Sequence, residues 1–214
     1  YLLKEGKMDY KLHDLITLTN GNVFPKDTVL TEEEKNDIQT MGEIRDKERC
    51  YIYTPSVFEY DRYSEGSTIG EEKYLKYPQK FLSVREGDVV ISPITQFAGI
   101  VRDHEFSMLL SPNHIKVSLE ESIIDKSYFI FWFNELSQAR RQISEMKQGT
   151  TVIKLPTSGL KRMTISLPKL DQQQLLGKAY INSLQLSEQL KRKKDLELQF
   201  IKGINQQLIE SEKK

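Results

Sequence analysis

Acidic side chains beside a lysine are the first residues in this sequence whose spacing could support catalysis. Asp27 and the run Glu33-Glu-Lys35 have the acidic-x-lysine spacing used by metal-dependent nucleases. That chemistry needs its carboxylates on neighbouring strands around Mg²⁺. Thr31 and Glu34 instead form a capping box, which predicts a short surface helix over residues 31–41. We therefore interpret these acids as part of a helix and not as a nuclease site.

Histidine and cysteine are few and lie far apart in the sequence. His13, His104 and His114 lack zinc-ligand spacing, and no cysteine lies near them to act as a nucleophile. Cys50 is the single cysteine, which excludes an internal disulfide and a multi-cysteine metal site and favours a reducing, cytoplasmic location. The cofactor glycine motif and the Asn/Asp-Pro-Pro-aromatic motif of amino-methyltransferases are absent, as is a phosphate-binding glycine loop. We predict a non-catalytic chain that holds no metal and no cofactor.

Basic, amide and aromatic side chains are interleaved in two segments, a mixture that is typical of DNA contacts. Lys and Arg bind phosphates, whereas forked or planar donors bind base edges. One segment covers residues 73–80, in an expected loop before a strand, and the other covers residues 140–154. The candidate DNA-binding residues are Lys73, Tyr74, Lys76, Tyr77, Gln79, Lys80, Arg140, Arg141, Lys147, Gln148, Thr150, Thr151 and Lys154. Basic residues at 45–49 form a further candidate cluster among acids, and a solvated surface role is the alternative for each residue.

Charge is segregated along the chain although the formal net charge is zero. Residues 27–72 contain thirteen acids and five basic residues, whereas residues 128–169 contain seven basic residues and two acids. Segregation of this kind can produce a local positive surface that the average conceals. Random variation among solvated faces is an equally good explanation.

Hydrophobic patterning predicts a mostly β domain up to residue 168. A strand and a tight turn at Asn20-Gly-Asn22 are expected within residues 10–24. Further strands are expected at 50–54, 81–84, 89–91, 97–101, 115–119, 152–155 and 163–167. The turn Arg85-Glu-Gly-Asp88 joins two of them. Apolar spacings of three and four from Phe129 to Met146 predict one amphipathic helix that ends at Gly149.

Residues 171–209 predict a single long helix. They contain no proline, and Asp171 and Gln174 are placed as a capping box at its start. At about 1.5 Å per residue the helix is roughly 58 Å long, which exceeds the diameter of a domain of ~170 residues. Its apolar side chains would be left in water, so we expect coiled-coil-like pairing with another helix. The expected pairing residues are Leu176, Tyr180, Leu184, Leu190, Ile201, Ile204 and Leu208.

A basic run, Lys191-Arg-Lys-Lys194, interrupts the apolar spacing in the middle of this helix. We interpret it as a solvated face on which Glu188, Asp195 and Glu197 supply local ion pairs. Contact with a phosphate backbone between two half-sites is the alternative.

The junction before the long helix resembles that of type I restriction-modification specificity subunits. The run Thr164-Ile-Ser-Leu-Pro-Lys-Leu-Asp-Gln-Gln173 is similar to the strand, Leu-Pro-x-Leu and polar-Gln pair that precede the family's conserved helix. Residues 11–21 resemble the family's first strand and glycine turn, and residues 81–92 its central Gly-Asp-Val hairpin. Residues 148–160 resemble the stretch before the closing strand.

The resemblance implies an α+β protein that confers DNA specificity. Residues 1–168 would form a target recognition domain, and residues 169–214 a helix for dimerisation and for docking methyltransferase subunits. The implied partners are double-stranded DNA, methyltransferase subunits that use S-adenosylmethionine to methylate adenine, and a restriction subunit that uses ATP and Mg²⁺. No apolar run reaches membrane-spanning length, so no membrane partner is expected.

The family's full-length members carry two recognition domains and two conserved helices, whereas this sequence carries one of each. It is either a truncated piece or a natural half-subunit that forms a homodimer on a two-part site. Two other functions stay open. One is a helix-mediated adaptor that does not read DNA, and the other is the recognition segment of a fused restriction-methylation enzyme.

Overall fold

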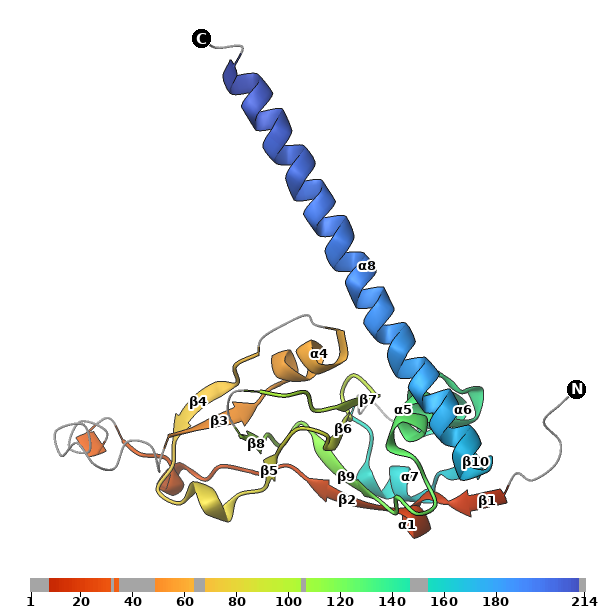
Figure 1. The fold of residues 1–214 in the computed structure, drawn as a ribbon. Helices are drawn as coiled ribbons and strands as arrows, with labels where there is room; N and C mark the ends of the chain where they lie inside the picture. The colour runs from red at the N-terminus through yellow and green to blue at the C-terminus, as the bar shows by residue number, and fades with distance from the viewer. Residues whose placement is uncertain are drawn as a thin grey trace, which may run out of the picture.

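A computed structural model describes residues 8–31, 33–34, 49–63, 68–104, 107–146 and 154–211. Two four-stranded sheets and a two-stranded ribbon form a mixed domain, and one long helix leaves it (Figure 1). The structure confirms the predicted α+β class and the long C-terminal helix. Within the described part of the chain, no helix has the length and apolar character needed to cross a membrane.

The first sheet is antiparallel throughout, with the strand order β2-β9-β6-β7. Its strands are β2 (Ile16–Asn20), β6 (Val89–Ser92), β7 (Phe97–Ile100) and β9 (Ile115–Leu119). Helix α5 (Lys126–Glu135) packs on it and contributes the fully buried Phe129 and Trp132. β6 separates two hydrophobic clusters, because Val89 and Ile91 belong to one and Val90 to the other. Burial on both faces explains why this strand is apolar without alternation.

The second sheet has the order β4-β3-β8-β5, and β3 and β8 run parallel. Its strands are β3 (Arg49–Tyr53), β4 (Glu71–Tyr74), β5 (Ser83–Val84) and β8 (Met108–Leu110). Helix α4 (Pro55–Tyr63) follows β3 and buries Val57 and Phe58 in the cluster that contains Tyr53 and Leu110. The two sheets therefore share a continuous interior through β6.

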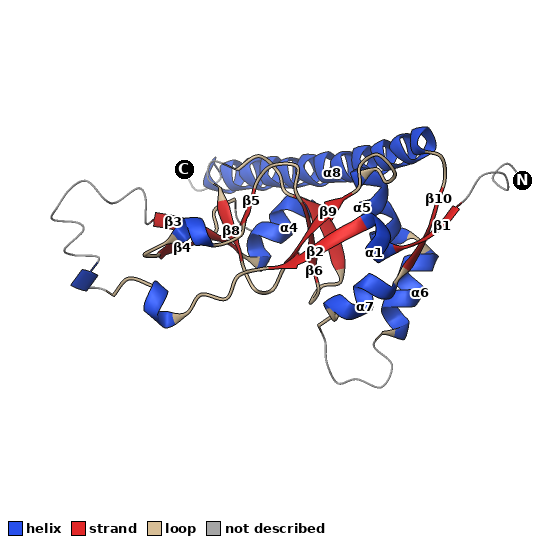
Figure 2. Ribbon diagram, turned by 90° about the horizontal axis from the view of Figure 1, so that it is seen from below, coloured by secondary structure: helices blue, strands red, loops and turns tan. Residues whose placement is uncertain are grey.

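The remaining elements gather where the chain enters and leaves the domain. Strand β1 (Met8–Lys11) pairs antiparallel with β10 (Thr164–Leu167). The helices α1 (Leu12–Leu15), α6 (Ser137–Glu145) and α7 (Thr157–Arg162) lie at the same end of the molecule (Figure 2). Gln138 and Gln142 of α6 bind β10 through their side-chain amides, at 2.9 Å to Ser166 Oγ and 2.8 Å to the Thr164 carbonyl.

The prediction of one strand and a tight turn at residues 10–24 is confirmed only for the strand β2, and the single strand and the turn are wrong. Two strands occur there, separated by the helical turn α1, which buries Leu12 and Leu15 on the same side. A spacing of three allows this in a helix, whereas a strand would turn them to opposite faces. Gly21 makes no left-handed turn, because only Gly87 among the described glycines has a positive φ. A Cβ on Gly21 would lie 1.8 Å from the Ser111 carbonyl oxygen, so close approach requires this glycine.

The aromatic helix is two helices and not one. The backbone becomes extended at Leu136 (ψ 135°), which separates α5 from α6. The indole N–H of Trp132 donates to Gln138 Oε1 across the break at 3.0 Å. Gly149 and residues 152–153 lie outside the described residues, and Lys154 and Leu155 are not in a strand.

The turn at residues 85–88 is confirmed, and Gly87 adopts φ 81° there. It does not close a hairpin, however, because β5 and β6 belong to different sheets. β6 makes its hairpin with β7 instead. Of the expected strand 81–84, residues 83–84 form β5, whereas residues 81 and 82 are not part of a strand. The capping box is confirmed, since the Glu34 N–H donates to Thr31 Oγ1 and the Thr31 N–H donates to Glu34 Oε2; the rest of the expected helix, residues 35–41, lies outside the described residues.

The long helix, α8, covers Leu170–Ser211 and has 42 residues. The Gln173 N–H donates to the Lys169 carbonyl, so Lys169 is the N-cap, and the prediction that Asp171 holds that place is wrong. Gln173 is buried and joins the start of α8 to α5. Its amide donates to the carbonyls of Ile123 and Pro168, and its Oε1 accepts from the N–H of Asp125, the N-cap of α5.

Candidate nucleic-acid interface

Two loops far apart in the sequence form one surface at the end of the domain that carries β4. We call residues 22–30 and 75–82 the platform. The Lys76 N–H donates to the Thr28 carbonyl at 2.9 Å, and the Leu30 N–H donates to the Tyr74 carbonyl at 3.0 Å. Phe24 and Phe81 pack beneath them with ring centroids 5.1 Å apart. These contacts hold the two loops as a unit.

Asn22 attaches the platform to the second sheet. Its Nδ2 donates to the carbonyls of Leu82 and Leu110 at 2.7 and 2.9 Å, and its Oδ1 accepts from the Leu82 N–H at 2.7 Å. Three hydrogen bonds leave this amide one free acceptor site. The sequence suggested a turn role for Asn22, and the positioning role was missed because residue 22 is bound to residues 82 and 110.

Three neighbouring side chains of the platform point outward with complementary chemistry. Tyr77 is half exposed, and the Lys80 ammonium lies 4.4 Å from its ring centroid. Gln79 is exposed between them in the short 3-10 helix η2 (Pro78–Lys80). An ammonium can bind a phosphate, an amide can pair with adenine through two hydrogen bonds, and a tyrosine ring can stack on a sugar or base. Lys26, exposed in the 3-10 helix η1 (Lys26–Thr28), adds a cation that the sequence patterns did not indicate.

The other basic residues of this segment have acidic partners. Lys73 Nζ lies 2.6 Å from Glu71 Oε1, and Lys76 Nζ lies 2.8 Å from Glu34 Oε1. The hydrogen bond from Lys76 lowers the pKa of Glu34 to about 2 and raises the pKa of Lys76. Tyr74 is half-buried in β4, and its hydroxyl donates to Glu72 Oε1. Tyr77, Gln79 and Lys80 are therefore the members of the segment best placed for an external ligand.

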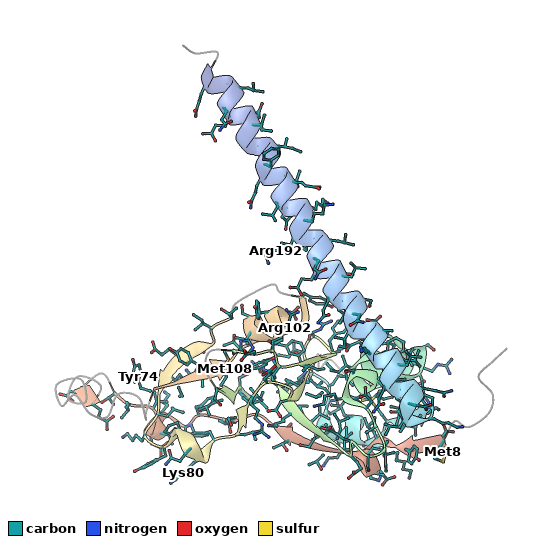
Figure 3. The ribbon with its side chains drawn as sticks, viewed as in Figure 1. Met8, Tyr74, Lys80, Arg102, Met108 and Arg192 are labelled. Atoms are coloured by element: carbon teal, nitrogen blue, oxygen red, sulfur yellow. The ribbon has the colours of Figure 1, made fainter. Side chains whose placement is uncertain are left out.

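Arg140 and Arg141 of the second predicted cluster lie on α6, at the opposite end of the domain, whereas Lys154 lies beside the turn at residues 111–114, to which Gly21 is hydrogen-bonded. Figure 1 shows α6 and β10 at one end and β4 at the other, and Figure 3 places Tyr74 and Lys80 together far from Met8 of β1. Arg140 donates to the Gln96 carbonyl at 2.8 Å and lies over the Phe97 ring, so it supports the β6–β7 turn. Arg141 is exposed, and Lys154 donates to the Pro112 carbonyl.

Several candidate residues lie outside the described residues. These are Lys147, Gln148, Thr150 and Thr151, together with Arg45 and Lys47 of the third cluster. The described members of the two main clusters do not form a single surface. Among the described candidate residues, exposed cationic, amide and aromatic side chains lie next to one another only on the platform.

The family model for the type I restriction modification DNA specificity domain matches residues 4–198. The chain belongs to this family. The match covers both the platform and most of α8. A search of curated proteins gives no match to this sequence.

Solved structures of specificity subunits have the same fold. The HsdS subunit from Thermoanaerobacter tengcongensis aligns with a TM-score of 0.54 and 15% identity, over 88% of this chain and 39% of that one. The type I S subunit from M. genitalium gives a TM-score of 0.50 and 12% identity, over 84% and 39%. A chain from a structure on complex assembly and conformational transition of the type I R-M system gives 0.55 and 14%, over 88% and 40%. The chain spans about two fifths of the length of these proteins.

The long helix of this specificity domain has two distinct faces. Gln173, Gly177, Tyr180, Leu184 and Glu188 recur at spacings of three and four and lie toward the domain. At Gly177, a Cβ would lie 2.5 Å from the Tyr128 backbone nitrogen, so the two helices approach closely there. The Tyr180 hydroxyl donates to Glu135 Oε1 at 2.8 Å, and burial raises its pKa to about 12. Of the predicted pairing residues, Tyr180 thus contacts this chain's own domain, and Leu184 lines a cleft that faces it.

A different face carries the other predicted pairing residues. At ~100° per residue, Leu190, Ile201, Ile204 and Leu208 fall on one stripe about a quarter turn from Tyr180, on the side away from Glu188. All four are exposed, Leu190 at 58% and Ile201 at 60%. Leu176, near the start of the helix, is 41% exposed on the same side. Lys193 and Glu197 interrupt the stripe and pair with each other at 3.8 Å. Whether a second helix covers this stripe stays a prediction.

Proposed function

We propose that this chain reads one half of a two-part DNA site for a type I restriction-modification complex. The observation that carries the proposal is the family match over residues 4–198, which covers an exposed platform and a helix with an uncovered apolar face. The platform binds the major groove, and α8 pairs with a second copy or a second half. The same helix docks methyltransferase subunits, through which the restriction subunit joins.

In this proposal some side chains of the platform supply affinity for DNA and others supply sequence specificity. Lys80 and Lys26 bind phosphates and supply affinity without sequence information. Gln79 presents an amide to a base edge, and Tyr77 contacts the adjoining sugar or base. The chain itself performs no chemistry. S-adenosylmethionine, ATP and Mg²⁺ belong to the partner subunits, and among the described residues no three His, Cys, Asp or Glu side chains are grouped as a metal site.

Two substitutions on the platform test this division. Methylome sequencing of a host identifies the target, and duplexes carrying it are titrated with the chain and its methyltransferase subunits at several salt concentrations. Lys80→Ala should weaken all duplexes alike and reduce the salt slope by about one. Gln79→Ala should lower discrimination at one base pair by about 1–3 kcal/mol. Lys11→Ala, an exposed lysine of β1 at the other end of the domain, is the matched control and should change neither quantity.

The rival adaptor function makes the opposite prediction. An adaptor that does not read DNA shows no sequence preference and little salt dependence. Failure of the wild-type complex to bind either specific or non-specific duplex would contradict the proposal. If both platform variants keep the wild-type sequence specificity, the DNA sequence is read by a different surface of the chain.

A further inference from the structure

The long helix touches the domain at a second place beyond its packing on α5. Arg102 Nη2 donates to Glu188 Oε2 at 3.0 Å, and each side chain is about one third exposed. Figure 3 shows Arg102 between α4 and α8, where the helix passes over the domain. Glu188 lies two turns beyond Tyr180, the last aromatic contact with α5. The helix is thus held near its start and again by this ion pair.

Arg102 is held rigidly from the domain side. Its Nε donates to the Asp61 carbonyl at 2.8 Å, and its backbone N–H donates to Asp61 Oδ1 at 3.2 Å. The Asp61 carboxylate has no exposed surface, and it accepts from the Tyr53 hydroxyl at 2.5 Å and contacts His104 Nε2 at 2.7 Å. A continuous polar chain therefore runs from the core of the second sheet to the surface of α8.

A cleft of about 400 Å³ separates α8 from the domain beside this ion pair. Arg62, Gly99 and Arg102 line its domain side, and Ile181 and Leu184 line its helix side. Because the interface is hollow there, close apolar packing does not by itself determine the angle of the helix. The polar contact at Glu188 bridges the two sides at this end of the cleft.

We infer that Arg102 and Glu188 form a clamp that fixes the angle at which α8 leaves the recognition domain. About 35 Å of helix follows Glu188, so a rotation of ~10° moves its end by roughly 6 Å. That distance corresponds to about two base-pair steps. The functional consequence rests on the proposed function: the clamp sets the spacing between this platform and whatever platform the paired helix carries. Arg102 and Glu188 are positioning residues that do not touch DNA.

The angle can be measured without DNA. Spin labels are placed at Ser56→Cys on α4 and Gln207→Cys on α8 in a Cys50→Ala background, and labelled chain is diluted with unlabelled chain to remove distances between copies. Pulsed electron resonance should give a narrow distance distribution for the otherwise wild-type chain. Glu188→Ala should broaden or shift it, whereas Glu188→Gln, which keeps an acceptor oxygen, should preserve most of it.

Glu197→Ala is the matched control, because Glu197 is a carboxylate on the same helix that pairs with Lys193 and not with the domain. It should leave the distribution unchanged. A partly exposed ion pair contributes little to stability, so the melting temperature of Glu188→Ala should stay near the wild-type value. An unchanged narrow distribution in Glu188→Ala would overturn the clamp.

The consequence for spacing is tested on duplexes whose half-sites are moved apart or together by one or two base pairs. The wild type should prefer the native spacing by about tenfold or more, and Glu188→Ala by less than about threefold. If no duplex binds at all, the proposed function fails while the distance measurement still decides the clamp. If duplexes bind and both proteins show the same preference, the clamp does not set the spacing.

Discussion

At the scale of single residues, backbone hydrogen bonds between residues 20–22 and 110–114 position the platform on the domain. Gly21 donates its N–H to the His114 carbonyl, and Asn22 donates its N–H to the Leu110 carbonyl. Neither role has a local sequence signal, because each partner is about ninety positions away. The Asn-Gly pair predicted a turn, whereas the structure uses the glycine for close approach and the asparagine for positioning the platform.

His114 gives these contacts a dependence on pH. It is 1% exposed, its Nδ1 is 2.8 Å from Ser111 Oγ, and its Nε2 has no hydrogen-bond partner. Burial, with a smaller contribution from Lys154, lowers its pKa to about 4. The folded state therefore favours the neutral ring. As pH falls below about 6.5 the unfolded chain takes up the proton first, so stability is lost between about 6.5 and 4.

The loss from this one group amounts to about 3 kcal/mol by pH 4. Urea unfolding at pH 7, 5.5 and 4.5 measures it, with His114→Gln compared at each pH. The wild type should lose more stability than the variant as the pH falls, whatever the variant's stability at pH 7. The exposed His13→Gln is the control and should follow the wild type. Parallel pH profiles for wild type and His114→Gln would refute the assignment.

At the scale of elements, local signals explain which predictions succeeded. The turn at Gly87, the strands β6, β7, β9 and β10 and the extent of α8 follow from turn residues, apolar runs and helix-forming composition nearby. The sequence patterns did not indicate α4 or β8. β8 pairs in parallel with β3, more than fifty residues earlier, and such pairing is not encoded in either segment alone. Arg140 looked like a surface cation but supports Gln96 and Phe97 of the first sheet.

The exposed stripe of α8 gives a prediction at the same scale. Replacing Ile201, Ile204 and Leu208 by Asp puts three charges where a partner helix would pack, so the oligomer should dissociate while the domain stays folded. Sedimentation velocity measures the change in mass, and thermal unfolding checks the domain. A matched triple Asp variant at Gln199, Lys202 and Gln206, on the other side of the same helix, should keep the oligomer.

If α8 pairs through this stripe, the wild-type chain should sediment as more than one copy, and the stripe variant as one. An unchanged oligomer in the stripe variant would contradict pairing through this face, whichever other contacts hold the copies together. If the wild-type chain sediments as one copy, pairing between two copies is excluded, and the partner of this face must be a helix of another protein.

At the scale of the whole molecule, the proposed function gives the domain and α8 different tasks. The platform lies at the end of the domain that carries β4, and α8 rises from the end that carries β10 (Figure 1). The proposed reading and assembly surfaces thus lie apart, with the Arg102–Glu188 ion pair between them. The sequence predicted the helix from its composition, but the platform required the fold, because its two loops are about fifty residues apart.

In the proposed function, this chain selects the DNA sequence for a methyltransferase that it does not itself contain. The decisive measurement is methylome sequencing of cells that express the methyltransferase subunits with and without this chain. We expect adenine methylation at a two-part motif only when the chain is present. Methylation of the same sites in cells that lack the chain would refute the proposal.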